Sequence, residues 1–297
     1  MASSQKRVAE NAPGELFVDS SCIDCDTCRW LAPETFGAAE EHAFVARQPS
    51  TPAERHHALM ALVACPTGSI GSMRAREARP EIRAASAAFP DLIADRVYHC
   101  GFHDEASFGA ASYLIVREAG NVLVDVPRFA LPLVRRIEAL GGVRWLFLTH
   151  RDDVGDHQKF RDRFRCERVL HRDDLSASTR GVERLIDGVD TMRLDDELTA
   201  IPVPGHTRGS MCLLYRERFL MSGDHVAWSE DLGQIHAFRD ACWFDWDRQR
   251  DSMRRLLGHR FEWILPGHGR RCHFPASQMR RELEKCLEWM GRSQRLS

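Results

Sequence analysis

The chain has 297 residues, more than one domain usually holds, and this length predicts two domains. Its net charge of −2 argues against nucleic acid or a membrane surface as a partner, because both normally require a basic face. No apolar run suits a signal peptide or a membrane span, so we expect a cytoplasmic protein acting on a small molecule.

Four segments are expected from the change of composition along the chain. A polar, alanine-rich tail should be disordered, a short cysteine-containing domain follows it, and a stretch rich in alanine, arginine and glutamate links that domain to a larger one. The expected boundaries are 1–14 for the tail, 15–73 for the small domain, 74–96 for the linker and 97–297 for the large domain.

The small domain should contain two short strands and one helix. The strands are expected at Glu15–Asp19 and His42–Ala46. The helix is expected at Thr51–Ala64, because Thr51 can cap it and Pro52 suits its first position.

The large domain alternates apolar, strand-like runs with amphipathic segments, which predicts a layered α+β fold. The expected strands are Ser112–Val116, Val122–Val126, Trp145–Leu148, Val169–His171, Ala200–Val203, Cys212–Tyr215, Phe219–Met221 and Trp263–Leu265. The expected helices are Leu131–Leu140, Asp247–Leu257 and Ala276–Met290.

Four of the ten cysteines form one pattern. Cys22, Cys25 and Cys28 are separated by two residues each, and Cys65 is followed directly by Pro66. A loop with a thiol at every third residue can present three sulfurs to one iron–sulfur cluster, with the fourth ligand coming from a distant Cys-Pro. Four cysteines also suit a structural zinc ion, so that alternative stays open.

The stretch around these cysteines resembles the single-cluster ferredoxins over about 55 residues. The resemblance rests on the cysteine pattern together with Cys28-Arg-Trp-Leu-Ala-Pro-Glu-Thr-Phe36 and Ala64-Cys-Pro-Thr-Gly-Ser-Ile70. It implies a ferredoxin-like domain holding a [4Fe–4S] cluster on Cys22, Cys25, Cys28 and Cys65, since all four ligands are present.

Histidines and aspartates follow the ends of four expected strands in the large domain. A strand end holds a ligand rigidly, and a preceding glycine lets the backbone turn sharply toward a shared cleft. Four such ends supply enough donors for two metal ions with a bridging carboxylate. The four motifs are Thr149-His150-Arg-Asp152-Asp153-Val-Gly-Asp156-His157, Gly205-His206-Thr207, Gly223-Asp224 and Gly267-His268.

In order and spacing these motifs resemble the metallo-β-lactamase superfamily. The resemblance covers about His99 to Gly269 and implies an αββα fold with a two-metal site. By position, it implies one metal on His150, Asp152 and His206, a second on Asp156, His157 and His268, and Asp224 between them. It also implies that Asp125 and Thr207 support the ligands from behind.

The loop after His150 departs from the family pattern. It is two residues longer, and an aspartate stands where the family has its second histidine. Asp153 could therefore take the place of Asp152, and a mononuclear site is an alternative to the dinuclear one.

The preferred functional hypothesis is redox chemistry at a di-iron site supplied with electrons by the cluster. Replacing an imidazole by a carboxylate suits iron better than zinc, and a hydrolase has no use for an electron source. This hypothesis includes an electron-donor protein as a possible partner. The alternative is a zinc-dependent hydrolase of thioesters or esters, in which Asp156 orients the attacking water and the cluster is structural or sensory.

Overall fold

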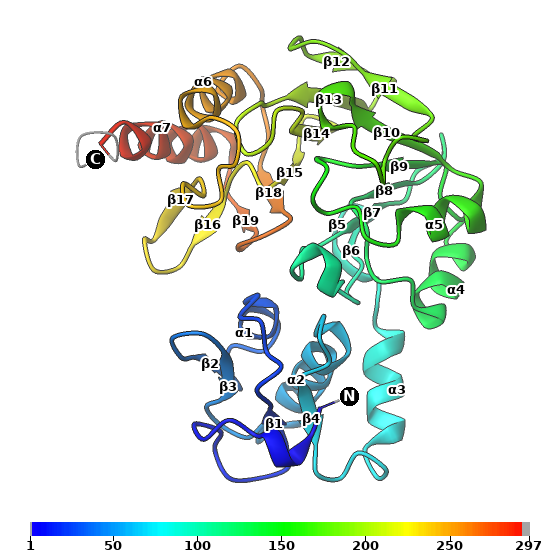
Figure 1. The fold of residues 1–297 in the computed structure, drawn as a ribbon, viewed down its shortest axis with the longest axis vertical. Coiled ribbons are helices and arrows are strands. Elements are labelled where there is room, and N and C mark those ends of the chain that lie inside the picture. Colours follow the sequence, from blue (N-terminus) through cyan, green and yellow to red (C-terminus); the bar gives the residue numbers. More distant parts are fainter. Residues whose placement is uncertain (1, 293–297) are drawn as a thin grey trace. The chain divides into compact units, whose positions relative to one another are not determined.

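The computed structural model describes residues 2–292. The chain divides into two compact units, and each unit is built from two separate stretches of sequence. The first unit comprises Met1–Arg144 and Gly155–Arg165, and the second comprises Trp145–Val154 and Cys166–Ser297. Figure 1 labels the elements of both. None of the described helices has the length and apolar character needed to cross a membrane.

The cysteine-containing part of the first unit has the two expected strands and the expected helix, together with two further strands and a short additional helix. Strand β1 (Leu16–Val18) pairs antiparallel with β4 (Ile70–Ser72), and β2 (Phe36–Ala38) pairs antiparallel with β3 (Ala43–Val45). Helix α1 is short, Thr27–Leu31. The predicted helix is confirmed as α2 (Pro52–Ala64), whose first turn is capped by Thr51 through a hydrogen bond from the Glu54 amide.

The N-terminal residues differ from the expected disordered tail. Residues Ser4–Lys6 form a short 3-10 helix, and the backbone of Arg7 forms an isolated antiparallel β-bridge with that of Asp19. The buried side chain of Asn11 donates to the Val18 carbonyl oxygen and accepts from the Val18 amide, at 2.8 and 2.9 Å. Buried backbone groups require hydrogen-bond partners of this kind. Amino-acid composition does not predict which side chain supplies them, so it did not predict the order of this segment.

The remainder of the first unit begins with turns at residues 73–78 and helix α3 (Arg79–Ala87), which fall within the stretch expected to be a linker. An antiparallel meander follows, made of β5 (Asp91–Ala94), β6 (Val97–His99), β7 (Tyr113–Ile115) and β8 (Val122–Val124). Helices α4 (Leu131–Ala139) and α5 (His157–Phe164) complete the unit, together with the 3-10 turn Glu105–Ser107.

The second unit contains two groups of strands. Three of them are parallel: β9 (Trp145–Phe147), β10 (Glu167–His171) and β11 (Arg184–Ile186). The other group is a sheet in the order β12 (Met192–Arg193), β13 (Leu198–Pro202), β14 (Met211–Tyr215), β15 (Phe219–Gly223), β18 (Trp263–Pro266) and β19 (Cys272–His273). The hairpin β16 (Ala227–Ser229) and β17 (Gln234–His236) lies between β15 and β18 in the chain.

The core of this second sheet is apolar and is covered by two helices. Helix α6 (Trp246–Leu256) contributes Met253 and Leu256, and helix α7 (Ala276–Arg292) contributes Leu283. These side chains pack against strand residues such as Leu220 and Ile264. A packed sheet of this kind fixes the ends of β13, β15 and β18, from which three of the predicted ligand loops begin.

Candidate metal centres

The four patterned cysteines line one cavity in the first unit. Cys22 and Cys25 lie in the loop after β1, Cys28 lies in α1, and Cys65 follows the last residue of α2. All four line a single small cavity whose other walls include Pro66 and Ile70. The structure therefore brings together the complete cysteine set predicted from the sequence.

The loop that carries the first cysteines has an unusual backbone. Asp24 and Asp26 both have left-handed conformations, with φ of 55° and 63°, a region that aspartate tolerates better than most residues. The guanidinium group of Arg29 contacts both carboxylates at 2.5 Å. This ion-paired network holds the turns between the cysteines.

Amide and hydroxyl groups lie within hydrogen-bonding distance of the sulfur atoms of Cys22, Cys25 and Cys65. The Ala43 amide donates to Cys22 Sγ at 3.4 Å, and hydroxyl groups of Thr27 and Ser69 lie 3.5 and 3.3 Å from the sulfurs of Cys25 and Cys65. Hydrogen bonds to ligand sulfurs are a main determinant of the reduction potential of an iron–sulfur cluster. Burial and then the neighbouring cysteines raise the pKa of the Cys28 thiol well above its usual range.

The spread of the sulfur atoms separates the two metal alternatives. Within residues 2–292, no three cysteine sulfurs lie inside a common 4.8 Å limit. A tetrahedral zinc ion would draw four thiolates to about 3.8 Å from one another, given a Zn–S bond of about 2.3 Å. The wider spacing favours the larger iron–sulfur cubane, and the four-thiol donor set fits that group.

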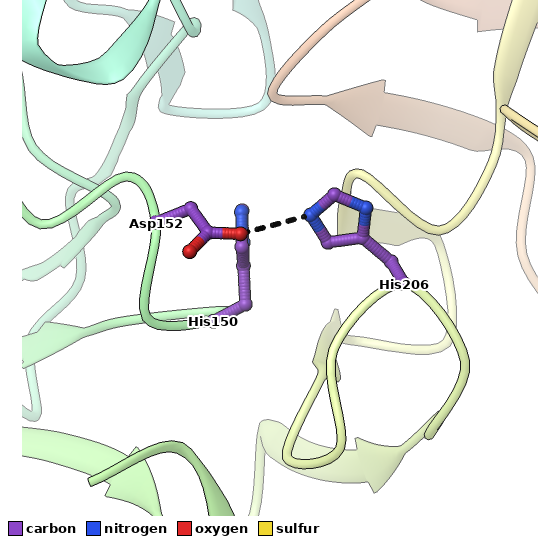
Figure 2. Close-up of side chains that lie close together, drawn as sticks. All are labelled: His150, Asp152 and His206. Carbon is purple, nitrogen blue, oxygen red and sulfur yellow. Dashed lines mark ion pairs between the residues drawn. The ribbon is translucent and has the colours of Figure 1, made fainter. Parts of the chain in front are cut away.

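The second unit gathers the first predicted metal set, as Figure 2 shows. Donor atoms of His150, Asp152 and His206 all lie within 4.8 Å of one another. The Oδ2 atom of Asp152 is 3.4 Å from Nε2 of His206. His150 comes from the loop after β9, and His206 comes from the loop after β13.

A second, overlapping group contains His150, Asp153 and Asp224. Asp224 Oδ2 lies 3.8 Å from Nε2 of both His150 and His206, and 2.8 Å from Nδ1 of His268. Asp153 Oδ2 lies 3.6 Å from His150 Nε2 and 3.9 Å from His268 Nδ1. Asp224 is therefore the central carboxylate, and both aspartates of the lengthened loop face the same donors.

Buried nitrogen atoms support the interpretation as a metal site. Nε2 of His150 and Nε2 of His206 are inaccessible to solvent, and neither has a hydrogen-bond partner in the described part of the chain. Burying such an atom without a partner is costly, and a cation between these nitrogens and the carboxylates would satisfy them. The donor set of imidazole and carboxylate groups thus fits a divalent metal.

The other ring nitrogen of each histidine fixes its orientation. His206 Nδ1 lies 2.6 Å from the Ala241 carbonyl oxygen, to which it donates, so that Nε2 faces the carboxylates. His150 Nδ1 lies 3.0 Å from the Thr149 hydroxyl oxygen. The carbonyl contact selects the tautomer of His206 that leaves its Nε2 available as a ligand, and the Thr149 contact holds the orientation of the His150 ring.

The electrostatics of the site suit metal binding. Burial lowers the pKa of His150 to about 4, so its imidazole is neutral at pH 7. Burial alone would raise the pKa of Asp224, but the charge of His268, followed by its hydrogen bond, holds that pKa well below the usual range. Burial opposes protonation of His206, yet Asp152 raises its pKa. The site thus presents ionised oxygen and at least one neutral nitrogen donor.

Two of the predicted glycines are needed for close approach. Gly223 has a φ of 50°, and a Cβ atom there would lie 2.4 Å from Oγ1 of Thr149. A Cβ atom on Gly267 would lie 2.8 Å from Asp224 Oδ1. Side chains at either position would push apart the loops that carry the ligands.

Asp174 is an organising residue that the sequence reading did not assign to the site. Its side chain is fully buried, and its carboxylate accepts from the amides of Arg151 and Gly209 and from the Thr207 hydroxyl, at 3.0, 2.7 and 2.6 Å. It ties the loop of His150 to the loop of His206. The predicted supporting role of Thr207 acts through this carboxylate. The available signal is the partial motif His171-Arg-Asp-Asp174, which repeats the His-Arg-Asp-Asp order of residues 150–153 at the end of another strand.

The predicted ligands Asp156 and His157 belong to the first unit. The Asp156 carboxylate accepts from the Phe129 amide at 2.8 Å and lies 2.6 Å from Nζ of Lys159. His157 is buried and is the first residue of α5. Asp125, also in the first unit, is buried directly after β8 with a φ of 53°. The two groups described above contain neither Asp156 nor His157.

The aromatic stretch 228–246 divides between two environments. Trp228 and Trp246 pack against the apolar core of the second sheet. Trp243 and Phe244 are instead exposed, at 63% and 45%. The Trp243 ring lies 6.3 Å from the His206 ring, and its amide donates to the His206 carbonyl oxygen, so this part of the stretch borders the candidate site.

Together, the cysteine cavity and the imidazole–carboxylate cluster define a ferredoxin-type iron–sulfur domain combined with a metallo-β-lactamase fold. Residues 18–72 match the sequence model of the 4Fe-4S single cluster domain of Ferredoxin I. The DIM-1 metallo-β-lactamase exposed to ceftazidime has the same fold, with 15% identity, a TM-score of 0.51, and coverage of 67% of this chain and 95% of that one.

Other solved structures are similar at lower TM-scores. ETHE1 from Myxococcus xanthus shares 20% identity at a TM-score of 0.47 and covers 66% of this chain and 85% of its own. An archaeal metallo-β-lactamase superfamily protein from Sulfolobus tokodaii shares 16% identity at 0.46, covering 66% and 86%. No curated protein matches the chain significantly in sequence.

Proposed function

We propose that this protein is a metal-dependent redox enzyme in which a [4Fe–4S] cluster supplies electrons to a dinuclear, iron-containing site. The observation that carries the proposal is the composition of the second donor set. Three carboxylates and three imidazoles lie near one another, in a chain that also carries a cavity lined by four cysteines. Oxygen-rich donor sets suit iron better than zinc.

The geometry favours a particular division of ligands. His150, Asp152 and His206 would hold one metal, as predicted from the sequence. The second metal would not be held by Asp156, because the Asp156 carboxylate is engaged with the Phe129 amide and Lys159. The proposed second set is Asp153, Asp224 and His268, with Asp224 shared between both metals.

When bound, the cluster would supply single electrons and the two iron ions would supply open positions for an oxidant. The chain's own residues prepare the site for this role. His150 stays neutral because it is buried, and Asp224 stays ionised beside three imidazoles. The exposed ring of Trp243 lies 6.3 Å from the buried ring of His206, so Trp243 stands beside this ligand.

The test combines a metal analysis with one kinetic measurement. Iron and zinc per chain should be quantified in protein purified without added metal, with Mössbauer spectroscopy to separate cluster iron from other iron. The dithionite-reduced cluster should then be mixed with oxygen, and its reoxidation should be slower in His206→Ala than in the parent protein. Asp162→Ala is the matched control, because Asp162 is exposed and lies outside the donor set.

Two results would contradict the proposal. One is a second site that contains zinc alone, and the other is reoxidation of the cluster at the same rate in His206→Ala. Turnover of an acylated glutathione by the zinc-loaded, cluster-free form would instead support the hydrolase alternative.

A further inference from the structure

The first unit contains a large cavity that neither candidate metal centre uses. Its volume is about 820 Å³, within the range of small-molecule binding sites. The walls include α2 and α3, which pack against each other (Figure 1), and the segment that follows Cys65. The cavity is open to solvent on one side, so a ligand can enter without a change in fold.

The lining combines an apolar surface with positive charge. Phe17, Phe102 and Ile82 contribute to the apolar part. Arg76 and Arg79 bring guanidinium groups to the rim, and Arg128 brings a third. No carboxylate belongs to the described lining. Such a surface recognises a molecule with a flat or apolar body and an anionic group, because guanidinium forks bind phosphate and carboxylate oxygens.

The positive charge is not cancelled by nearby acids. Glu81 on α3 and Glu15 both pair with Arg55, at 2.7 and 3.1 Å, and the Arg55 guanidinium lowers the pKa of Glu81. Within residues 2–292, Arg76 and Arg79 have no ion-pair partner, so both guanidinium groups are available to a ligand.

Arg128 has a different role from the other two arginines. It donates to the carbonyl oxygens of Pro66 and Val63, each at 3.3 Å, and so fixes the segment around Cys65. The cavity wall is thereby preorganised beside a cluster ligand, which reduces the ordering that a bound molecule must impose.

The cavity also adjoins the cysteine cavity directly. Thr67 and Ile70 line both cavities, so a molecule bound in the larger one would lie beside the wall of the cysteine cavity. We propose that this cavity binds a flavin-type ligand, a planar redox-active ring with a phosphate group. The ring would pack on the apolar wall that includes the half-buried side chains of Leu62 and Ile82, and Arg76 and Arg79 would hold the phosphate. This proposal deepens the redox function proposed above by naming a small molecule beside the cluster.

Flavin mononucleotide is the ligand for the test, and the protein is the full chain with its cluster. Its binding should be followed by quenching of flavin fluorescence and by calorimetry. Riboflavin has the same ring without the phosphate, and adenosine monophosphate has a phosphate on a different ring. We expect each to bind roughly tenfold more weakly than flavin mononucleotide, because each lacks one of the two recognised groups.

The variants give the second arm of the experiment. Arg76→Gln combined with Arg79→Gln should weaken flavin mononucleotide binding by roughly tenfold or more and leave riboflavin binding unchanged. Arg83→Gln is the matched control, because Arg83 lies on α3 but outside the cavity lining. It should bind like the parent chain, and circular dichroism should show that all variants fold.

Three results would overturn the proposal: no binding of flavin mononucleotide, equal binding of either comparison ligand, or equal binding by the double variant. The measurement involves no turnover and does not depend on the second metal site. Failure here would therefore leave the metal analysis intact, and failure of the metal analysis would leave this binding result intact.

Discussion

The Thr207 hydroxyl donates a 2.6 Å hydrogen bond to Oδ2 of Asp174, the same carboxylate oxygen that accepts from the Arg151 amide. This one oxygen connects the loop that carries His150 to the loop that carries His206. Neither Thr207 nor Asp174 is among the proposed ligands, yet together they fix the distance between two of them.

Asp174→Asn should therefore lower the metal affinity of the imidazole–carboxylate site by about tenfold, because the loss of a group that orients a ligand typically weakens metal binding by about this factor. The amide cannot accept all three hydrogen bonds as a carboxylate does, and one NH₂ group would face a donor. Metal per chain after dialysis against a weak chelator measures the effect. Asp173→Asn is the control, because Asp173 is exposed and its carboxylate contacts Arg208 rather than the ligand loops' amides. Equal retention of metal by both variants would contradict this role.

The two aspartates of the lengthened loop should have separable effects. We expect Asp152→Ala to release the metal held with His206, and Asp153→Ala to release the one held near His268. Each variant should retain about one non-cluster metal ion per chain where the parent retains two. A single ion in the parent protein would indicate a mononuclear site, and loss of both ions from either variant would contradict separate roles for the two aspartates.

Asp156→Asn distinguishes the structural assignment from the one implied by family resemblance. If its carboxylate serves to accept the Phe129 amide and to pair with Lys159, the variant should keep its metal. The free energy of unfolding should fall by about 1 kcal/mol, the usual size for one such hydrogen bond. Metal analysis and urea unfolding give both quantities, and a large loss of metal would restore Asp156 as a ligand.

Cys65→Ala should abolish the visible absorption of the cluster, because the other three cysteines cannot complete a four-cysteine set. Cys166→Ala is the control, since Cys166 is buried in the second unit and lies outside the cysteine cavity. The second site should keep its metal in both variants. Persistence of full absorption in Cys65→Ala would point to a different fourth ligand.

The metal-free protein should become less stable as the pH falls from about 6.5 toward 3. Burial, followed by the charge of His206, lowers the pKa of His225 from 6.5 to about 3. The unfolded chain therefore binds a proton in this window and the folded chain does not, so acid favours unfolding by up to about 1.4 kcal/mol per pH unit. Urea unfolding at several pH values measures the slope, and His225→Asn should reduce it. An unchanged slope in that variant would assign the effect to other buried histidines.

The sequence predicted those parts of the protein that depend on local pattern. The strands that end before His150, His206, Asp224 and His268 are each apolar runs followed by a turn, and the structure has strands at all four. The cysteine spacing likewise identified one shared cavity, since three of its four ligands lie within seven residues.

Long-range partners could not be predicted in the same way. Asp174 becomes part of the site only because folding brings it to Thr207, 33 residues away. The order of the N-terminal residues depends on Asn11 meeting the backbone of β1 and of Val45, which composition does not reveal. The helix after Asp156 was missed because its polar first turn gives a weak periodic signal, with only His157 and Phe160 buried.

The order of the proposed ligands along the chain has a consequence for biogenesis. Cys65, the last of the four patterned cysteines, leaves the ribosome 203 residues before His268, the last residue of the other donor set. Because chains fold progressively from the N-terminus during synthesis, the complete cysteine set emerges while the proposed second centre still lacks its final imidazole. Insertion of a cluster at that stage would separate the two proposed metal-loading steps in time.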